Sequence, residues 1–166
     1  MKKIIGFSIS IFVLQLTVLA LPASAETLQG TWKLVAAEDL RDDGSVARHP
    51  WGLKPVGAIV VEDGSCYVQI MSGDVPSFPS TTTTVNEQME ASLLSSYIAY
   101  TGPCTFDDAA GSTTMTVQAA WRPNYVGTSQ TRYYRFEGNT LLYGPAHGSI
   151  RFGDEQLTRR LTLERP

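Results

Sequence analysis

The side chains of this 166-residue chain most capable of chemistry are two cysteines, two histidines and a short run of alternating polar and aromatic residues. Cys66 is a conceivable nucleophile, because a thiolate can attack an electrophile. His49 and His147 are flanked by proline or glycine, and neither belongs to a nucleophile-bearing or zinc-binding motif. Cysteine and histidine do not recur at the spacing of metal ligands. We therefore expect no catalytic residue set, no metal and no cofactor, and we favour a binding protein over an enzyme.

The alternating run covers residues 130–136. Successive side chains of a β-strand point to opposite faces, so one face carries four of its residues: Gln130, Arg132, Tyr134 and Phe136. Aromatic surface combined with one amide and one cation is typical of a site for a mainly apolar ligand with a polar or anionic end. The alternative is that Arg132 is a solvated residue on the outside of a sheet.

Turn-forming residues recur at short intervals along the chain, for example over 42–45, 62–65 and 137–139. The segments between the turns are rich in Val, Ile, Thr, Tyr or Trp and predict eight strands. These cover residues 29–39, 55–62, 65–72, 96–106, 113–122, 130–137, 139–144 and 156–164. Hairpin-sized links favour an antiparallel meander, and closure of the sheet removes its exposed edges. We therefore expect an all-β domain, an eight-stranded antiparallel up-and-down barrel, which is wide enough for a small ligand.

One segment departs from the strand pattern. Residues 84–87 fit a capping box, in which the Thr84 hydroxyl and the Glu87 carboxylate satisfy backbone donors. This predicts one short helix, over 85–95, between the third and fourth strands. Met89, Leu93 and Tyr97 would share one face of it and pack on the barrel or across its mouth. The preceding stretch, 77–84, is expected to be a loop.

The N-terminal residues have the pattern of a targeting segment. A basic start is followed by an almost unbroken apolar run and by Ala23-Ser24-Ala25, a small-x-small cleavage site. We expect a signal peptide over 1–25, removed from a barrel domain over 26–166, and a periplasmic or secreted product without integral membrane insertion. An uncleaved anchor is the alternative.

The charge of the chain argues against nucleic acid as a partner. The formal net charge is −3 for the whole chain, and residues 1–25 contain two lysines and no acids, so removing them gives −5. A duplex binder needs a basic face instead. Acidic pairs such as Glu38-Asp39 are interpreted as solvated charges.

Both cysteines lie in the predicted barrel domain, in segments with strand character. Export into an oxidising compartment favours a single disulfide between Cys66 and Cys104. Two buried free thiols are the alternative, because the sequence does not establish that the two strands are neighbours.

Several short motifs resemble those of lipocalin-like domain proteins over nearly all of 28–165. They lie at 28–35, with Gly30-Thr31-Trp32, and at 55–60, 63–65, 67–71, 97–102, 123–128 with Gln130 and Arg132, and 163–165. The most specific is the run Pro123-Asn-Tyr-Val-Gly-Thr128 with the following Gln130 and Arg132. The resemblance implies that Gly30 and Trp32 begin the first strand, that Trp32 closes one end of the barrel, and that Arg165 stacks on the indole.

Three more residues are candidate ligand contacts. The resemblance favours an inward-pointing Gln69, which would place Tyr67 and Met71 on the same inner face. The alternative is that Cys66, Val68 and Ile70 form the inner face of this strand. Trp121 is in phase with Met115 and Val117, which predicts an inner position. Tyr100 could line the mouth of the barrel or pack under the helix.

Three functions remain open at this point. The first is an exported barrel that binds a small apolar or amphipathic molecule through Gln69, Tyr100, Trp121, Gln130, Arg132 and Tyr134. The second is an isomerase, cyclase or hydratase that acts on such a molecule inside the barrel. The third is a barrel filled by its own side chains that serves as a protein-interaction module. The sequence does not determine the oligomeric state.

Overall fold

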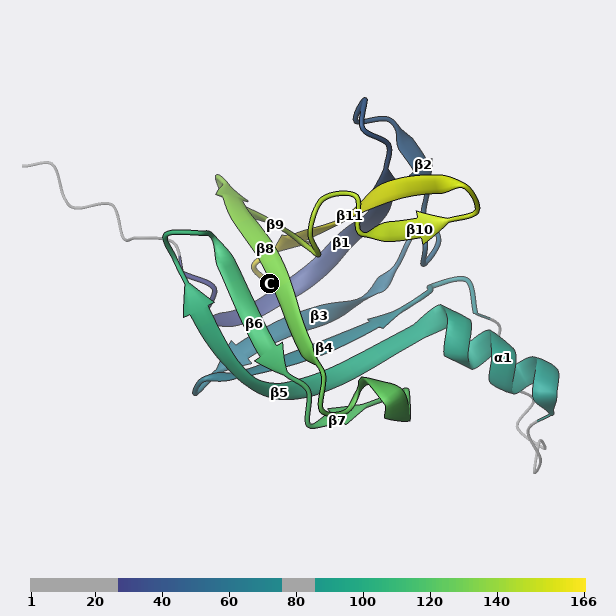
Figure 1. Cartoon of the computed structure of the whole chain (residues 1–166), viewed down its shortest axis with the longest axis horizontal. Helices are drawn as coiled ribbons and strands as arrows, with labels where there is room; N and C mark the ends of the chain where they lie inside the picture. The colour runs from purple at the N-terminus through teal and green to yellow at the C-terminus, as the bar shows by residue number, and fades with distance from the viewer. Residues whose placement is uncertain (1–26, 76–85) are drawn as a thin grey trace, which may run out of the picture.

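The computed structural model of the chain describes residues 27–75 and 86–166. These residues form a β-barrel from which one short helix projects (Figure 1). The expected signal peptide over 1–25 and the expected loop over 77–84 lie outside the described residues.

Strands dominate the described chain. They are β1 (Gly30–Leu40), β2 (Val46–Arg48), β3 (Val56–Glu62), β4 (Ser65–Met71), β5 (Tyr97–Asp107), β6 (Ser112–Thr116), β7 (Ala119–Ala120), β8 (Ser129–Glu137), β9 (Thr140–Gly144), β10 (Ile150–Phe152) and β11 (Glu155–Glu164). Helix α1 spans Glu87–Ser96, and a single turn of 3-10 helix, η1, spans Pro123–Tyr125.

Eight of these strands close the barrel, in the order β1, β3, β4, β5, β6, β8, β9 and β11. Every pairing is antiparallel, and β11 pairs with β1 to complete the ring. The predicted eight-stranded up-and-down barrel is therefore confirmed. Strands β2 and β10 are short additions that the sequence pattern did not predict, and the single strand expected over 113–122 is two strands, β6 and β7.

A bulge in β1 determines which of its residues face the interior. The register between β1 and β11 shifts between Leu34 and Ala36, so one extra residue is accommodated there. Trp32 and Leu34 are buried before the bulge, and Ala37 and Asp39 are buried after it. The change of phase carries Asp39 into the barrel, although simple alternation from Trp32 would place it outside.

One end of the barrel is closed by Trp32. Its indole Nε1 donates a hydrogen bond of 2.9 Å to the carbonyl of Leu28, and the Arg165 guanidinium lies 4.0 Å from the ring centroid. Arg165 in turn donates to the carbonyls of Gln29 at 2.6 Å and Thr27 at 2.9 Å. Gly30 has a φ of +98°, and a Cβ there would lie 2.6 Å from the Arg165 guanidinium. A larger residue at position 30 would therefore displace the arginine that covers Trp32.

Helix α1 occupies nearly the predicted range but differs in its cap and its packing. Its N-cap is Asn86, whose side chain accepts a 2.9 Å hydrogen bond from the Met89 amide, so the predicted Thr84 cap is wrong. No residue of the helix is buried, and it projects beyond the start of β5 (Figure 1). The expected packing on the barrel is also wrong, because Leu93 and Leu94 are too few to form an apolar face and stay exposed.

The predicted disulfide is confirmed: Cys66 and Cys104 are bonded, with their Cα atoms 5.9 Å apart. Cys66 on β4 pairs in register with Gly102 on β5, which brings Cys104 to the diagonal position. The bond therefore links two adjacent strands of the barrel from its interior side, where Cys66 is buried.

Removing this bond should destabilise the barrel. The two cysteines are 38 residues apart, and closing a loop of that size in the unfolded chain contributes about 2–4 kcal/mol. We expect the double variant Cys66→Ser/Cys104→Ser to lose about that amount in urea denaturation. Wild-type protein under reducing conditions should lose a similar amount, and an unchanged midpoint in both would contradict the prediction.

Candidate ligand-binding site

A cavity of about 210 Å³ lies inside the barrel, away from the end that Trp32 closes. Much of its wall is apolar, from Trp51, Val68, Ile70, Ile98, Ile150 and Leu161. The polar groups come from Tyr100 on β5, Gln130 and Arg132 on β8, and Arg159 on β11. An apolar wall with a few convergent polar groups is the usual composition of a small-molecule site. The volume is below the roughly 300 Å³ at which sites for drug-sized ligands begin, so the cavity suits a small molecule.

The face of β8 that was predicted to bind ligand does point inward. Gln130, Arg132, Tyr134 and Phe136 are half-buried, whereas the intervening Thr131, Tyr133 and Arg135 are exposed. Arg132 is therefore not a solvated residue of the outer surface. The alternation of the sequence was sufficient to identify this face, because β8 contains no bulge.

Arg132 is held in the cavity by neutral acceptors only. Its guanidinium donates to the Gln130 side-chain oxygen at 3.1 Å, to the Tyr100 hydroxyl at 3.4 Å and to the Thr131 carbonyl at 2.8 Å. Gln130 is itself oriented by a 2.9 Å hydrogen bond from its amide nitrogen to the Thr128 hydroxyl. None of the residues that line the cavity is a carboxylate. The positive charge of Arg132 therefore has no counter-charge within the wall.

Tyr100 stays protonated in this setting. Burial raises the pKa of Tyr100 above its ordinary value, and the nearby Arg132 opposes that rise. The neutral hydroxyl can accept from Arg132 and still donate to a ligand. Tyr100 also contacts Trp121 and Tyr125, with ring centroids 6.4 and 5.9 Å away, so its ring is held in place.

A second charged group lies beside the cavity and was missed by the sequence analysis. Asp39 is fully buried, and its two oxygens accept from Arg159 at 2.7 and 2.8 Å. Arg48 approaches the same carboxylate at 3.2 Å, and Trp51 covers Arg159 with its ring centroid 4.8 Å from the guanidinium carbon. The interpretation of Asp39 as a solvated charge was wrong, because the β1 bulge turns it inward. No signal in the local sequence indicated this.

The charges around the cavity sum to a positive value. Arg132 and Arg159 in the wall contribute two positive charges, and Asp39 beside the wall contributes one negative charge. The chain as a whole is negative, with a formal net charge of −3. An interior of opposite sign to the whole molecule favours an anionic group in the cavity.

Three of the predicted ligand contacts, Gln69, Trp121 and Tyr134, do not line the cavity. Gln69 is exposed on the outer face of β4, where its amide nitrogen donates to the Tyr97 hydroxyl at 3.0 Å. The predicted inward orientation was wrong, because the alternate residues Cys66, Val68 and Ile70 fill the interior.

Trp121 lines an outer groove together with Gln69 and Tyr97, and it is not among the residues that line the cavity. Trp121 does not lie on the same face as Val117, because the strand partner of the chain changes between β6 and β7. Val117 bonds to Thr128, whereas the next residue, Gln118, bonds to Thr101 of β5. Alternation therefore does not carry through this segment.

Tyr134 points inward but lies nearer the closed end, where it packs edge-on against Phe136 at 5.8 Å. Its hydroxyl donates to Asp108 at 2.8 Å. Partial burial, together with this hydrogen bond and the charge of Asp108, raises the pKa of Tyr134 to about 12. Tyr134 does not line the cavity that contains Arg132.

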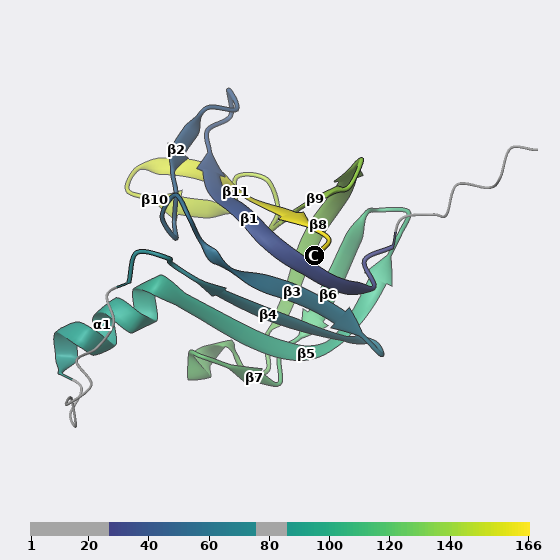
Figure 2. The same cartoon turned by 180° about the vertical axis from the view of Figure 1, so that it is seen from behind.

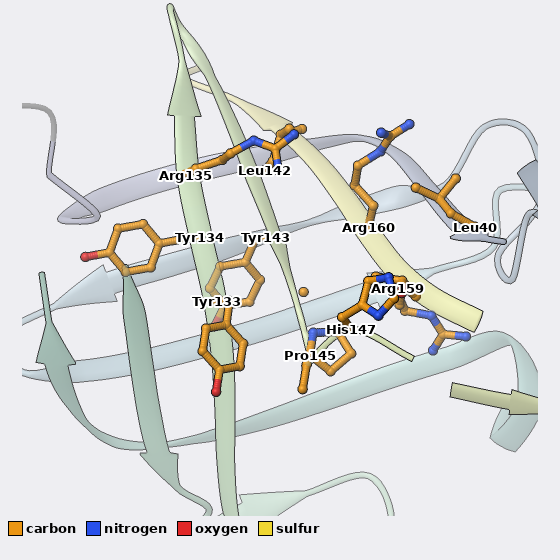
Figure 3. A pocket seen from close by; sticks show the side chains of 13 residues that line it. Leu40, Tyr133, Tyr134, Arg135, Leu142, Tyr143, Pro145, His147, Arg159 and Arg160 are labelled. Atoms are coloured by element: carbon orange, nitrogen blue, oxygen red, sulfur yellow. The ribbon is translucent and has the colours of Figure 1, made fainter. Parts of the chain in front are cut away.

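Another hollow, of about 750 Å³, lies across the outer faces of β8, β9 and β11 (Figure 3). Its arginine and histidine side chains already have partners. Arg135 pairs with Glu137 at 2.9 Å, Arg160 with Glu38 at 2.7 Å and His147 with Asp42 at 3.7 Å. Although this hollow is large, none of the side chains named above is left without an oppositely charged partner. The interior cavity, where Arg132 has only neutral partners, is therefore the stronger candidate for a ligand-binding site.

Two further features of the described residues bear on partners. Over 27–75 and 86–166, no helix has the length and apolar character needed to cross a membrane. The same residues contain no group of three or more Cys, His, Asp or Glu side chains that could hold a metal ion.

Comparison with known proteins identifies one family. The family model described as "Lipocalin-like domain" matches residues 29–166. Neither the curated proteins nor the solved structures include a match to this chain.

Proposed function

Because the chain belongs to the lipocalin-like domain family, we propose that it is an exported binding protein that holds a small amphipathic anion inside its barrel. The observation that carries this proposal is the position of Arg132, which faces the interior cavity and has only neutral hydrogen-bond partners. A carboxylate or similar anion could accept two parallel hydrogen bonds from such a guanidinium.

The rest of the ligand would contact the apolar wall. Val68, Ile70, Ile98 and Leu161 offer aliphatic surface, and Trp51 and Tyr125 offer aromatic surface. Burial of an apolar body contributes about 25 cal/mol per Å², while the anionic end would be oriented by Arg132, Tyr100 and Gln130. The 210 Å³ volume restricts the ligand to a compact molecule.

Export agrees with two properties of the chain. The apolar N-terminal segment with its Ala-Ser-Ala site is typical of a signal peptide, and a disulfide persists in an oxidising compartment. We therefore propose a periplasmic or secreted location for the mature barrel. N-terminal sequencing of the protein from its host should find a mature terminus after Ala25, and an uncleaved chain would contradict this part of the proposal.

Binding is tested with hexanoate and benzoate as anionic probes, and with hexanol and benzyl alcohol as their neutral counterparts. Replacing Arg132 by glutamine should weaken binding of the acids by roughly 1.5–3 kcal/mol, the contribution of a charged hydrogen bond. This corresponds to about 10- to 150-fold in Kd. The affinities for the alcohols should change little. Isothermal titration calorimetry measures both.

Arg135→Gln is the matched control, because Arg135 lies on the same strand but on the outer face, paired with Glu137. It should leave all four affinities unchanged. Equal losses in the two variants would place the anion outside the cavity, and the absence of saturable binding to any of the four probes would contradict the proposal. Recovery of a chemically altered probe would favour an isomerase or related enzyme instead.

A further inference from the structure

A second candidate site lies on the outside of the barrel, across β3, β4, β5 and β7. Two neighbouring hollows of about 410 and 340 Å³ share the side chains of Tyr67, Gln69 and Tyr97. Trp121 lines the far end of the second hollow. Figure 2 shows β3, β4 and β5 running side by side, with β7 along β5. We call this surface the aromatic groove.

The aromatic groove carries no charge. None of the residues that line its two hollows is Asp, Glu, Lys, Arg or His. Cations lie beside the groove: Lys33 pairs in register with Ala58 at one side, and Arg122 lies over the Trp121 ring at the other. In a chain with 29 charged residues, 13 basic and 16 acidic, an uncharged groove of this kind favours a neutral ligand.

The groove combines aromatic rings with hydrogen-bonding groups at its surface. Tyr67 is 48% exposed, and within the described residues its hydroxyl makes no hydrogen bond that would compete with a ligand. The Gln69 amide nitrogen donates to the Tyr97 hydroxyl, which leaves the amide oxygen of Gln69 available as an acceptor. Trp121 packs edge-on against Tyr125 at 4.7 Å. The side chains of Gln69, Tyr97 and Trp121 are therefore held in place before any ligand binds.

The geometry argues against a protein occupant. Strands β3, β4 and β5 each pair on both sides, so this face has no free edge to which an extended peptide could add. Three strands spaced about 4.8 Å apart, over five residues that rise about 3.3 Å each, cover about 240 Å². A stable dimer requires about 800 Å² per partner. The footprint suits a ligand of a few rings.

We propose that the aromatic groove binds a neutral oligosaccharide. The weakly polar face of a sugar ring would pack on Tyr67 and Trp121, and its hydroxyl groups would bond to Gln69 and to the Tyr67 hydroxyl. Tyr67 suits this role because it offers an apolar ring and a polar group on one rigid side chain. Trp121 would contribute its ring alone, because its indole nitrogen is buried. This site lies on the outer side of β4 and β5 and shares Val68 and Tyr100 with the lining of the interior cavity, but it does not depend on the function proposed for that cavity.

The probes are chitohexaose, cellohexaose and maltohexaose, titrated into the purified protein up to millimolar concentrations in a calorimeter. At least one of them should bind saturably. Tyr67→Ala should weaken that binding about tenfold, which corresponds to the loss of one aromatic contact. Tyr133→Ala is the matched control, because Tyr133 is 49% exposed on the outer face of β8, and it should leave the affinity unchanged.

Three results would overturn the proposal. The first is a lack of saturable binding by all three oligosaccharides at millimolar concentration. The second is an equal effect of the Tyr67 and Tyr133 substitutions, which would locate the sugar elsewhere. The third is a wild-type dimer, seen by analytical ultracentrifugation, that dissociates in Tyr67→Ala but not in Tyr133→Ala, because the groove would then be an interface between two copies.

Discussion

Replacing Trp32 by alanine should lower the free energy of unfolding by about 3–5 kcal/mol, the usual cost of truncating a large buried aromatic residue. Trp32 is 3% exposed and closes one end of the barrel, where its ring contacts Phe136 at 5.7 Å. The substitution would also remove the surface on which Arg165 stacks and the hydrogen bond to Leu28. Urea denaturation followed by circular dichroism measures the change.

Trp32→Phe is the appropriate comparison, because it keeps an aromatic ring for Phe136 and Arg165 but loses the indole N–H. It should cost clearly less than Trp32→Ala. If Trp32→Ala lost less than about 1 kcal/mol, within the range of ordinary substitutions, Trp32 would not be a main element of the closed end. Should the alanine variant fail to fold, the phenylalanine variant still gives a measurable loss for comparison.

Replacing Asp39 by alanine should also lower the free energy of unfolding by about 3–5 kcal/mol, because it breaks a buried ion pair from one side. Arg159 would lose a two-point contact of 2.7 and 2.8 Å, and Arg48 would lose its 3.2 Å contact. Two guanidinium groups would then remain in the barrel without a carboxylate. The loss is measured by urea denaturation at neutral pH.

The adjacent residue is a matched control for this prediction. Glu38 points to the outer face of the same strand and pairs with Arg160 at 2.7 Å. The pair is only partly buried, with the Glu38 side chain 17% and the Arg160 side chain 37% exposed. Solvent therefore weakens it more than the Asp39 pair, and Glu38→Ala should cost clearly less than Asp39→Ala. Similar losses of unfolding free energy in the two variants would contradict the prediction, because the buried Asp39 pair would then stabilise the fold no more than the Glu38 pair.

The sequence by itself determined the architecture. Turn residues at short intervals and the β-branched or aromatic runs between them predicted eight barrel strands, and the structure confirms this number and their antiparallel order. It also identified the disulfide between Cys66 and Cys104 and the inner face of β8 that presents Gln130 and Arg132. The strands and the β8 face follow from turn chemistry and local alternation, which act over short distances in the sequence. The disulfide follows from the presence of just two cysteines in an expected oxidising compartment.

Only the tertiary structure decided which side chains meet in the cavity. The bulge in β1 turned Asp39 inward, and the break between β6 and β7 moved Trp121 to the outer groove. Gln69 faces outward because Val68 and Ile70 fill the interior, although either face of that strand was compatible with its sequence. Each outcome depends on register and on the strand that pairs alongside, and those are set by contacts between residues far apart in the chain. A shift of one residue in register exchanges the two faces of a strand, so local patterning could not determine these positions.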